Sequence, residues 1–227
     1  MPDMNRPTLH HFHSSSTSFR VRIALAVKGI DYQSVPIHLR WQDGDHDRPE
    51  YRAFNPQGNV PVLVDGGHPI VQSLAIIDYL DRTHPEPPLF PADPAGRARV
   101  WSLALWIACE IQPPNNLRVQ RHLAATAGLD QSALSRWQRH WIQIGFDALE
   151  TQLASSSATG RFCHGDTPTA ADCCLVPQVY NALRPVVGMD LAVWPTIDRI
   201  YRHCLTLPAV SSSLPTSQPD FESPAGH

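Results

Sequence analysis

A proline-dense segment divides this chain and limits what can form on either side of it. It reads "HPEPPLFPADPAG" from His84 to Gly96. Proline has no backbone N–H and a fixed φ angle, so this stretch can be neither a helix interior nor a central strand. We therefore expect an interdomain linker. In chain order, the expected parts are a first domain at 6–84, the linker at 85–94, a second domain at 95–210 and a loose, Ser- and Pro-rich tail at 211–227.

Strand and helix signals alternate ahead of the linker. Gly29 stands where a left-handed helix end belongs, and Pro36 favours an edge strand. The segment before the second pair of strands is expected to be irregular. The expected elements are a strand at 8–12, a helix at 18–28, a strand at 32–39, paired strands at 60–64 and 69–71 around "DGGH", and a helix at 72–84. This order predicts an α/β domain in which a parallel strand–helix–strand unit is followed by a hairpin.

Only helical patterns remain after the linker, which predicts an all-α second domain. The stretch "QPPNN" at 112–116 interrupts these patterns, because its two prolines remove two backbone donors. The expected helices are 97–110, 117–127, 131–153, 169–183 and 195–205.

Charge and composition narrow the classes of partner. Lys and Arg number 18 against 21 Asp and Glu, a net charge of −3, so the chain lacks the basic excess that nucleic-acid binding requires. No apolar run is long enough for a membrane span, and residues 1–7 lack a signal-peptide pattern, so we expect a cytoplasmic protein. The five cysteines form no Cys-x-x-Cys and the twelve histidines no His-Glu-x-x-His, so we expect buried reduced thiols and no metal site.

Five hydroxyl side chains stand in a row from Ser14 to Ser18, just before the first predicted helix. A helix cap needs only one of them. The N-terminus of a helix stabilises an anion, and a thiolate is such an anion. No cysteine lies nearby, so a thiolate would have to arrive on a ligand and accept a hydrogen bond from Ser15, Ser16 or Thr17. The alternative is a simple cap with a solvated loop.

Two further junctions can present polar groups to a ligand. Val60-Pro61 precedes a predicted strand, and a cis bond there would expose the Val60 peptide. Gln72 and Ser73 lie between a strand and a helix, where a hydroxyl and free N–H groups can hold a carboxylate. An ordinary helix cap explains the second junction equally well.

The second domain offers a capping box and two arginines. Thr169 and Asp172 have the spacing of a capping box, so Asp172 is expected to be structural rather than catalytic. Arg118 follows the interruption, Arg184 ends an apolar helix, and arginine pairs well with carboxylates. Surface exposure alone accounts for either arginine just as well.

Taken together, these segments resemble one family. "SSTSFRVRIALAVKGIDY", "NPQGNVPVLVDGG", "QSLAIIDYLD", "EIQPPNNLRV" and "GDTPTAADCCLVPQVYNALRP" are similar to the zeta-class glutathione transferases, which include maleylacetoacetate isomerase and maleylpyruvate isomerase. The resemblance covers nearly the whole chain up to Pro195. It implies a thioredoxin-like N-terminal domain with an all-α C-terminal helical domain, a homodimer and a cis Val60-Pro61 bond. It also implies glutathione as the cofactor and a place in aromatic amino acid catabolism.

The resemblance implies residue roles as well. The first serine of the family motif contacts the thiolate, a role that falls on Ser15, and Gln72 and Ser73 would hold the γ-glutamyl carboxylate while Val60 pairs with the cysteinyl backbone. The implied catalytic residues are Ser15, Ser16 and Thr17. The implied glutathione-binding residues are Ser15, Ser16, Thr17, Ser18, Phe19, Arg20, His46, Val60, Gln72, Ser73, Gln112, Asn116, Leu117 and Arg118. The implied substrate-binding residues are Arg20, Arg118 and Arg184.

The chain departs from the family pattern at two positions. Thr17 replaces the family cysteine, and Ser14 stands where an arginine that contacts the substrate carboxylate is common; His13, Arg20, Arg118 or Arg184 would have to supply that charge. The expected reaction is glutathione-dependent cis–trans isomerisation of maleylacetoacetate to fumarylacetoacetate by thiolate addition, rotation and elimination. Maleylpyruvate isomerases carry another arginine at the position of Leu117, so Leu117 favours maleylacetoacetate as the substrate. The alternatives are a maleylpyruvate isomerase, a general glutathione transferase or dehalogenase, and a non-enzymatic binding module of this fold.

Overall fold

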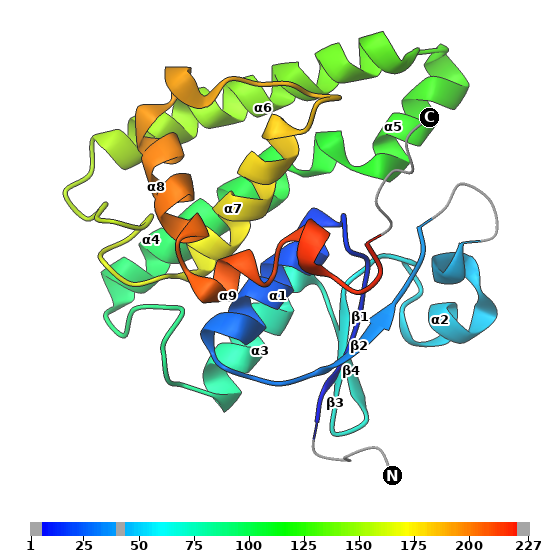
Figure 1. Ribbon diagram of the computed structural model, residues 1–227, viewed down its shortest axis with the longest axis horizontal. Coiled ribbons are helices and arrows are strands. Elements are labelled where there is room, and N and C mark those ends of the chain that lie inside the picture. The colour runs from blue at the N-terminus through cyan, green and yellow to red at the C-terminus, as the bar shows by residue number, and fades with distance from the viewer. Residues whose placement is uncertain (1–5, 40–43, 222–227) are drawn as a thin grey trace. The chain divides into compact units, whose positions relative to one another are not determined.

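The computed structural model describes residues 6–39 and 44–221, which divide into two compact units. The first unit runs to Leu89 and also includes the chain from Thr206 onward, and the second is Phe90–Leu205. The division at Leu89 falls inside the predicted linker. Figure 1 shows the elements of both units, and each unit is described by itself.

The first unit is built on a four-stranded sheet in the order β2-β1-β3-β4. Strand β1 pairs in parallel with β2 and antiparallel with β3, and β3 and β4 form a hairpin. The bounds are β1 Thr8–His11, α1 Ser16–Val27, β2 Gln33–Pro36, β3 Val62–Asp65, β4 His68–Val71 and α3 Ser73–Thr83. The predicted strand–helix–strand unit, the hairpin and the edge position of Pro36 are confirmed. Gly29, just beyond the end of α1, has a φ of 64°, as predicted.

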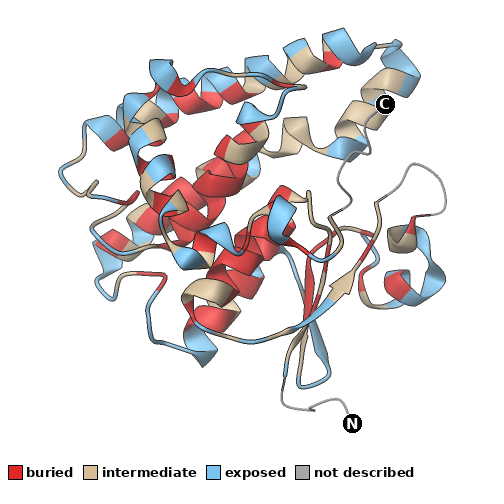
Figure 2. Cartoon of the chain, viewed as in Figure 1, coloured by how far each residue is buried: buried red, intermediate tan, exposed pale blue. Residues whose placement is uncertain are grey.

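Both faces of this sheet are covered (Figure 1). Successive side chains of a strand point to opposite faces. Leu9 and His11 are fully buried on one side, whereas the ring of His10 packs beside Phe54 on the other, with ring centroids 5.1 Å apart. Helices α1 and α3 lie together on the first face, and α2, at Pro49–Phe54, lies on the second. Figure 2 shows the buried stretches of α1 and α3.

Helix α2 and the 3₁₀ turn η1, at Asp45–Asp47, occupy part of the segment that was expected to be irregular. Proline at the first position of α2 suits a helix start, since its missing N–H would have no partner there. Tyr51 of α2 is 4% exposed and packs with Ile37, Val60 and Val62. A single turn and a half with one buried face leaves too little periodicity in the sequence to reveal the helix.

The prediction of a loose tail is wrong for its described part. Helix α9 at Pro208–Ser211 and the 3₁₀ turn η5 at Pro215–Ser217 fold onto the first unit, where α9 packs against α1. Ser213 is 3% exposed, and its carbonyl accepts a hydrogen bond from Nε of the buried Arg22 at 3.1 Å. A buried guanidinium needs acceptors, and the tail supplies one. Residues 206–210 therefore belong to the first unit and not to the helical domain.

The second unit is entirely helical, as predicted. Helix α4 packs against α7, and α6 packs against α8. The bounds are α4 Pro94–Leu105, the π-helical turn η2 Trp106–Ile111, the 3₁₀ turn η3 Pro113–Asn115, α5 Leu117–Ala127, α6 Gln131–Ala154, α7 Ala170–Leu183, the 3₁₀ turn η4 Leu191–Val193 and α8 Pro195–Leu205. Gly145 of α6 lets Ile111 approach, because a Cβ there would lie 2.4 Å from Cγ1 of Ile111.

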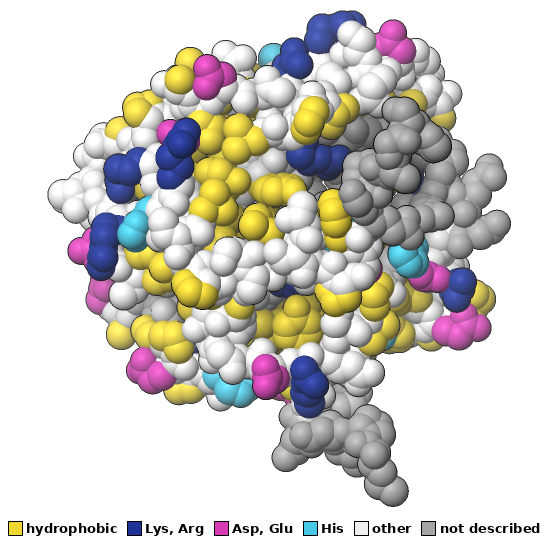
Figure 3. Space-filling model, in the orientation of Figure 1, with side chains coloured by type: hydrophobic (Ala, Val, Ile, Leu, Met, Phe, Trp, Pro, Cys, Tyr) yellow, Lys and Arg dark blue, Asp and Glu magenta, His cyan; other side chains and the backbone are white. Residues whose placement is uncertain are grey.

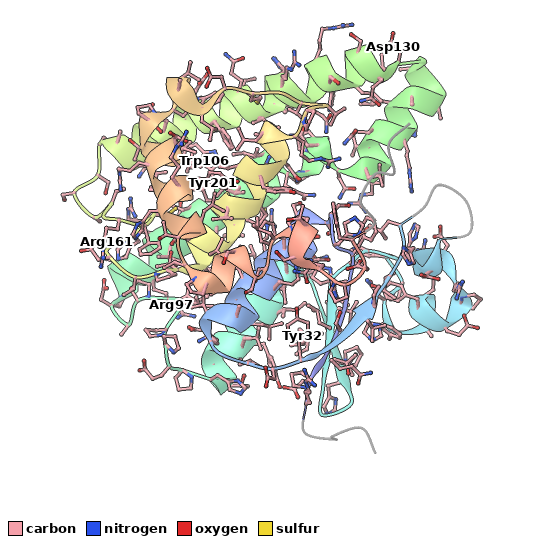
Figure 4. All side chains as sticks on the ribbon, viewed as in Figure 1. Tyr32, Arg97, Trp106, Asp130, Arg161 and Tyr201 are labelled. Carbon is pink, nitrogen blue, oxygen red and sulfur yellow. The ribbon has the colours of Figure 1, made fainter. Side chains whose placement is uncertain are left out.

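Polar side chains satisfy the helix starts of the second unit. Asp130, labelled in Figure 4, accepts the N–H of Ala133 at the start of α6. The predicted capping box is confirmed, because both oxygens of the buried Asp172 accept backbone N–H groups and Oδ2 also accepts the Thr169 hydroxyl. The carboxylate of Glu150 accepts the first two free N–H groups of α8. Asp172 is thus engaged in structure.

The state of the cysteines and the distribution of surface charge agree with the expectations from composition. All five cysteines are free; four are buried, and Cys109 is exposed. Burial raises the pKa of the Cys163 and Cys173 thiols. On the face drawn in Figure 3, Lys and Arg are scattered among Asp and Glu rather than gathered. Among the described helices, none combines the length and hydrophobicity of a membrane span.

Candidate functional site

The hydroxyl cluster lies at the N-terminus of α1. Ser15 is the N-cap residue, and its Oγ accepts the N–H of Ser18 at 3.2 Å. The hydroxyl oxygens of Ser15 and Thr17 are 2.9 Å apart, and Thr17 donates to the carbonyl oxygen of Val60 at 2.8 Å. A carbonyl only accepts, so the single proton of Thr17 points to Val60 and Ser15 is the donor to Thr17. The two hydroxyls form a directed chain that ends on Val60.

The same helix end has free donors. The N–H groups of Ser16 and Thr17 have no hydrogen-bond partner in the described part of the chain. Free N–H groups and the positive end of the helix dipole stabilise an anion. Ser15 and Thr17 are partly exposed, so a ligand can reach their hydroxyls. This end of α1 is therefore suited to an anionic group such as a thiolate.

The other predicted residues of the cluster face the interior. Ser18 is fully buried, and its Oγ accepts the N–H of Phe12 at 3.3 Å. Ser16 is 9% exposed. Phe19 is 1% exposed, with the guanidinium of Arg22 5.3 Å from its ring centroid. The row of hydroxyls thus divides into those that brace the helix start from inside and those that a ligand can touch.

The Val60-Pro61 bond is cis, as the resemblance implied. Val60 is 6% exposed, and its carbonyl holds the Thr17 hydroxyl. Its N–H has no partner among the described residues. The Val60 peptide therefore keeps an unused donor beside the hydroxyl chain.

The junction between β4 and α3 has an unusual backbone. Gln72 has a φ of 73° and a ψ of 118°, the one non-glycine residue with positive φ in the described chain. Such a conformation costs about 1–3 kcal/mol and is concentrated at ligand clamps. The exposed Gln72 side chain donates through Nε2 to Oε1 of Gln57 at 3.0 Å. Ser73, the first residue of α3, is 6% exposed.

Arg20 places an uncompensated charge beside Ser73. It is 2% exposed, and its Nη1 lies 3.4 Å from the Ser73 hydroxyl. Its Nε and Nη2 are buried without a hydrogen-bond partner in the described residues. A buried cation is costly unless it is paired. A carboxylate held by Ser73 and the N-terminus of α3 would supply the missing negative charge.

His46 lies in η1, apart from these groups in the hydrogen-bond pattern. Its Nδ1 is 3.3 Å from the carbonyl oxygen of His38, and its Nε2 is 3.3 Å from Oδ2 of Asp47. No hydrogen bond joins it to Ser15 or Ser73 within the described residues.

The four predicted residues of the second unit that lie around the interruption are close neighbours. Gln112 directly follows η2, and Asn116 caps α5 by accepting the N–H of Arg118 at 3.1 Å. Leu117 is 43% exposed, and Arg118 is exposed as well. Arg184 directly follows α7 and is also exposed. Neither arginine has an ion pair among the described residues, so both can receive a carboxylate.

Comparisons with known proteins agree with this geometry. Residues 9–88 match the family model "Glutathione S-transferase, N-terminal domain". A maleylacetoacetate isomerase of Mus musculus is 44% identical, covering 95% of each chain. The structure of a maleylpyruvate isomerase described as a bacterial zeta-class glutathione S-transferase has a TM-score of 0.90 at 43% identity, covering 94% of this chain and 99% of that one. The chain belongs to the zeta-class glutathione transferases.

A third comparison brings ligands. A maleylacetoacetate isomerase of Methylobacterium extorquens AM1, solved with malonate and glutathione bound, has a TM-score of 0.89 at 40% identity and covers 95% of this chain and 100% of that one. In the present chain, the donors at the N-terminus of α1 and on Arg20 that have no partner among the described residues suit an anionic tripeptide. Ser14 and Thr17 of the present chain stand in place of the arginine and cysteine expected for the family.

Sequence reasoning missed one group of residues behind the site of this transferase. Arg22 is 1% exposed and donates to the carbonyl oxygens of Phe12, His13 and Ser213, and Oδ2 of Asp220 accepts the N–H of His13. The one signal was a second arginine in the apolar run "FRVRIAL", which has to be buried or to interrupt the apolar face. Nothing in the tail itself indicated its partner.

Proposed function

We propose that this protein isomerises maleylacetoacetate to fumarylacetoacetate with glutathione as its cofactor. The observation that carries the proposal is the N-terminus of α1, where the free N–H groups of Ser16 and Thr17 lie beside the Ser15 hydroxyl. The names of the full-length relatives support the same reaction. Bound glutathione would supply a thiolate nucleophile that converts a cis double bond into a rotatable single bond.

The residues at α1 would hold that sulfur as an anion. The Ser15 hydroxyl now donates to Thr17 at 2.9 Å, and a rotation about its C–O bond redirects the proton toward a ligand. Its role as N-cap is unaffected, because Oγ accepts the Ser18 N–H through a lone pair. The N–H groups of Ser16 and Thr17 would add to the positive electrostatic potential that stabilises the thiolate. We assign the catalytic role to Ser15, with Ser16 and Thr17 contributing through these groups.

The remaining glutathione contacts in the first unit follow from its unused donors. Ser73, backed by the charge of Arg20, and the strained Gln72 would hold the γ-glutamyl carboxylate. The free Val60 N–H would pair with the cysteinyl backbone. His46 is assigned to glutathione on the resemblance alone. The buried Ser18 and Phe19 would support glutathione binding indirectly, by fixing the start of α1.

The second unit would supply the remaining contacts. We assign Gln112, Asn116, Leu117 and Arg118 to glutathione binding and Arg20, Arg118 and Arg184 to the substrate carboxylates. Ser14 replaces the family arginine, and Arg118 and Arg184 are exposed whereas Arg20 is buried, so these two arginines are more accessible to a substrate carboxylate. Charge-assisted hydrogen bonds to such arginines contribute about 1.5–3 kcal/mol each. We also propose that the enzyme works as a homodimer in the cytoplasm.

The test is a substrate panel with Ser15→Ala as the diagnostic variant. We expect turnover of maleylacetone, a maleylacetoacetate analogue, only when glutathione is present. Loss of one donor to a reacting anion lowers turnover by about 100-fold, so Ser15→Ala should lose that much with a modest change in glutathione affinity. Ser135→Ala, which removes a hydroxyl bound within α6, is the control. Faster turnover of maleylpyruvate, a chloro-acid or an aryl halide would assign one of the alternative reactions, and no glutathione binding would leave only the binding module.

A further inference from the structure

The tail reaches the loop that carries Ser15. Oδ2 of Asp220 accepts the backbone N–H of His13 at 3.0 Å and lies 3.3 Å from Nδ1 of the same residue. The Asp220 side chain is 3% exposed, so this contact is buried. Phe221 adds an edge-to-face contact to the His13 ring, with centroids 5.7 Å apart. Asp220 and Phe221 of the tail thus both contact His13, which lies two positions before Ser15.

Arg22 holds the same loop through its backbone carbonyl groups. Its Nη2 donates to the carbonyl oxygen of His13 at 2.9 Å, and its Nη1 to that of Phe12 at 3.3 Å. The Phe12 carbonyl also accepts the N–H of Ser15 at 3.1 Å, which closes a tight turn. The turn is therefore fixed through His13 N–H by Asp220 and through two carbonyls by Arg22. The direction of the Ser15 side chain depends on this turn.

The charges of the cluster make the contact more than a packing detail. Arg22 is a buried cation, and its pKa is lowered to about 10 by burial although Tyr32 and Asp220 raise it in part. Tyr32, labelled in Figure 4, lies near it, as do the neutral His11 and the His13 ring that contacts Asp220. Asp220 is the carboxylate that balances this cation. Removal of the Asp220 carboxylate would leave the buried Arg22 without this negative charge.

We propose that Asp220 is a positioning residue for the thiol site, which acts through the backbone of His13 on the hydroxyl of Ser15. This inference rests on the proposed function, because it assumes that Ser15 faces the glutathione sulfur. The contact is a hydrogen bond to a backbone N–H, so an uncharged acceptor of the same shape can replace it. The C-terminal segment is then part of the active site's support rather than an appendage.

The experiment compares Asp220→Ala and Asp220→Asn in the full-length protein. The readouts are the pKa of the bound glutathione thiol, from the ultraviolet absorbance of its thiolate, and kcat and KM with maleylacetone. A displacement of the nucleophile-positioning group by a fraction of an ångström lowers kcat by about tenfold, so we expect that loss in Asp220→Ala together with a raised thiol pKa. KM for glutathione should change by less than about threefold, because the binding contacts stay in place. Asp220→Asn should restore both readouts, because its amide oxygen can still accept the His13 N–H, while the loss of the charge beside Arg22 should lower only the melting temperature.

Hydrogen–deuterium exchange and a matched carboxylate complete the design. Exchange in residues 12–18 should rise in Asp220→Ala and return to the parent level in Asp220→Asn. Asp65→Asn is the control: Asp65 also accepts a side-chain donor, the Tyr79 hydroxyl at 3.0 Å, at the other end of the sheet. Unchanged thiol pKa and kcat in Asp220→Ala, with only a lower melting temperature, would overturn the proposal. Equal losses in the Ala and Asn variants would overturn it as well. A parent enzyme that leaves bound glutathione protonated would instead refute the proposed function.

Discussion

The hydroxyl of Thr17 donates a 2.8 Å hydrogen bond to the carbonyl oxygen of Val60, which lies 43 positions further along the chain. This bond joins the N-terminus of α1 to the segment before β3. It also fixes the proton of Thr17, so that the Ser15 hydroxyl donates to Thr17. The position at which this chain departs from the family cysteine therefore connects two of the three predicted ligand-binding segments of the first unit.

Thr17→Val should weaken glutathione binding more than catalysis. Valine has nearly the same shape but leaves the Val60 carbonyl without its donor, a loss of about 1 kcal/mol. We expect KM for glutathione to rise by about fivefold while kcat stays within about twofold of the parent, because Ser15 still faces the sulfur. Thr17→Ser retains the hydroxyl and is the control. A parent-like KM in Thr17→Val would show that the bond does not shape the binding site.

Gln72→Gly should change stability and affinity in opposite directions. Glycine adopts a φ of 73° without steric cost, so relief of strain should exceed the entropy cost of glycine and raise the free energy of unfolding by about 1 kcal/mol. Glutathione affinity should fall, because the amide that we assign to the carboxylate is lost. Urea unfolding and calorimetric titration measure the two effects.

Two other variants separate the causes of the Gln72 effect. Gln72→Ala removes the amide but keeps the strained backbone, so we expect lower affinity without added stability. Gln57→Ala removes the hydrogen-bond partner of Gln72 and leaves its backbone unchanged. A Gln72→Gly protein less stable than the parent would show that the conformation is not strained in this fold.

The elements that could be predicted from sequence are those with local causes. The turn "DGGH" defined the β3–β4 hairpin, Gly29 the end of α1, and Thr169 with Asp172 the start of α7. Each signal lies within a few residues of its effect. The hydroxyl cluster could be located in the same way, because helix capping and anion binding both require polar groups at a helix start.

The features that the sequence did not reveal depend on partners far along the chain. The burial of Arg22 is settled by a carbonyl 191 positions later, and the contact of His13 by Asp220, 207 positions later. No local pattern distinguishes such a tail from a solvated one. The π-helical turn of η2 was likewise missed: a helix to residue 110 was expected, but α4 ends at Leu105. Ile111 of that turn packs closely against Gly145 of α6, and such a tertiary contact cannot be read from the local sequence.

His11 has the clearest link between structure and pH. It is fully buried, its Nδ1 lies 3.4 Å from Nη1 of Arg22, and its Nε2 lies 2.7 Å from the Ser34 hydroxyl. Because Arg22 can only donate, Nδ1 is the acceptor, and the neutral ring donates through Nε2. Burial, with the charge of Arg22 as the next cause, lowers the pKa of His11 from 6.5 to about 4.

This lowered pKa predicts that the first unit loses stability on mild acidification. Between the unfolded pKa of 6.5 and the folded pKa of about 4 the unfolded chain binds the extra proton, so the free energy of unfolding falls as the pH falls. From about pH 7 to about pH 5 the loss from His11 alone should be about 2 kcal/mol. Urea unfolding at both pH values measures it, and His11→Gln, which cannot titrate, should lose less stability over the same range than the parent does. Exposed His122→Gln is the control and should behave as the parent. An equal loss in the parent and in His11→Gln would assign the pH dependence to other groups.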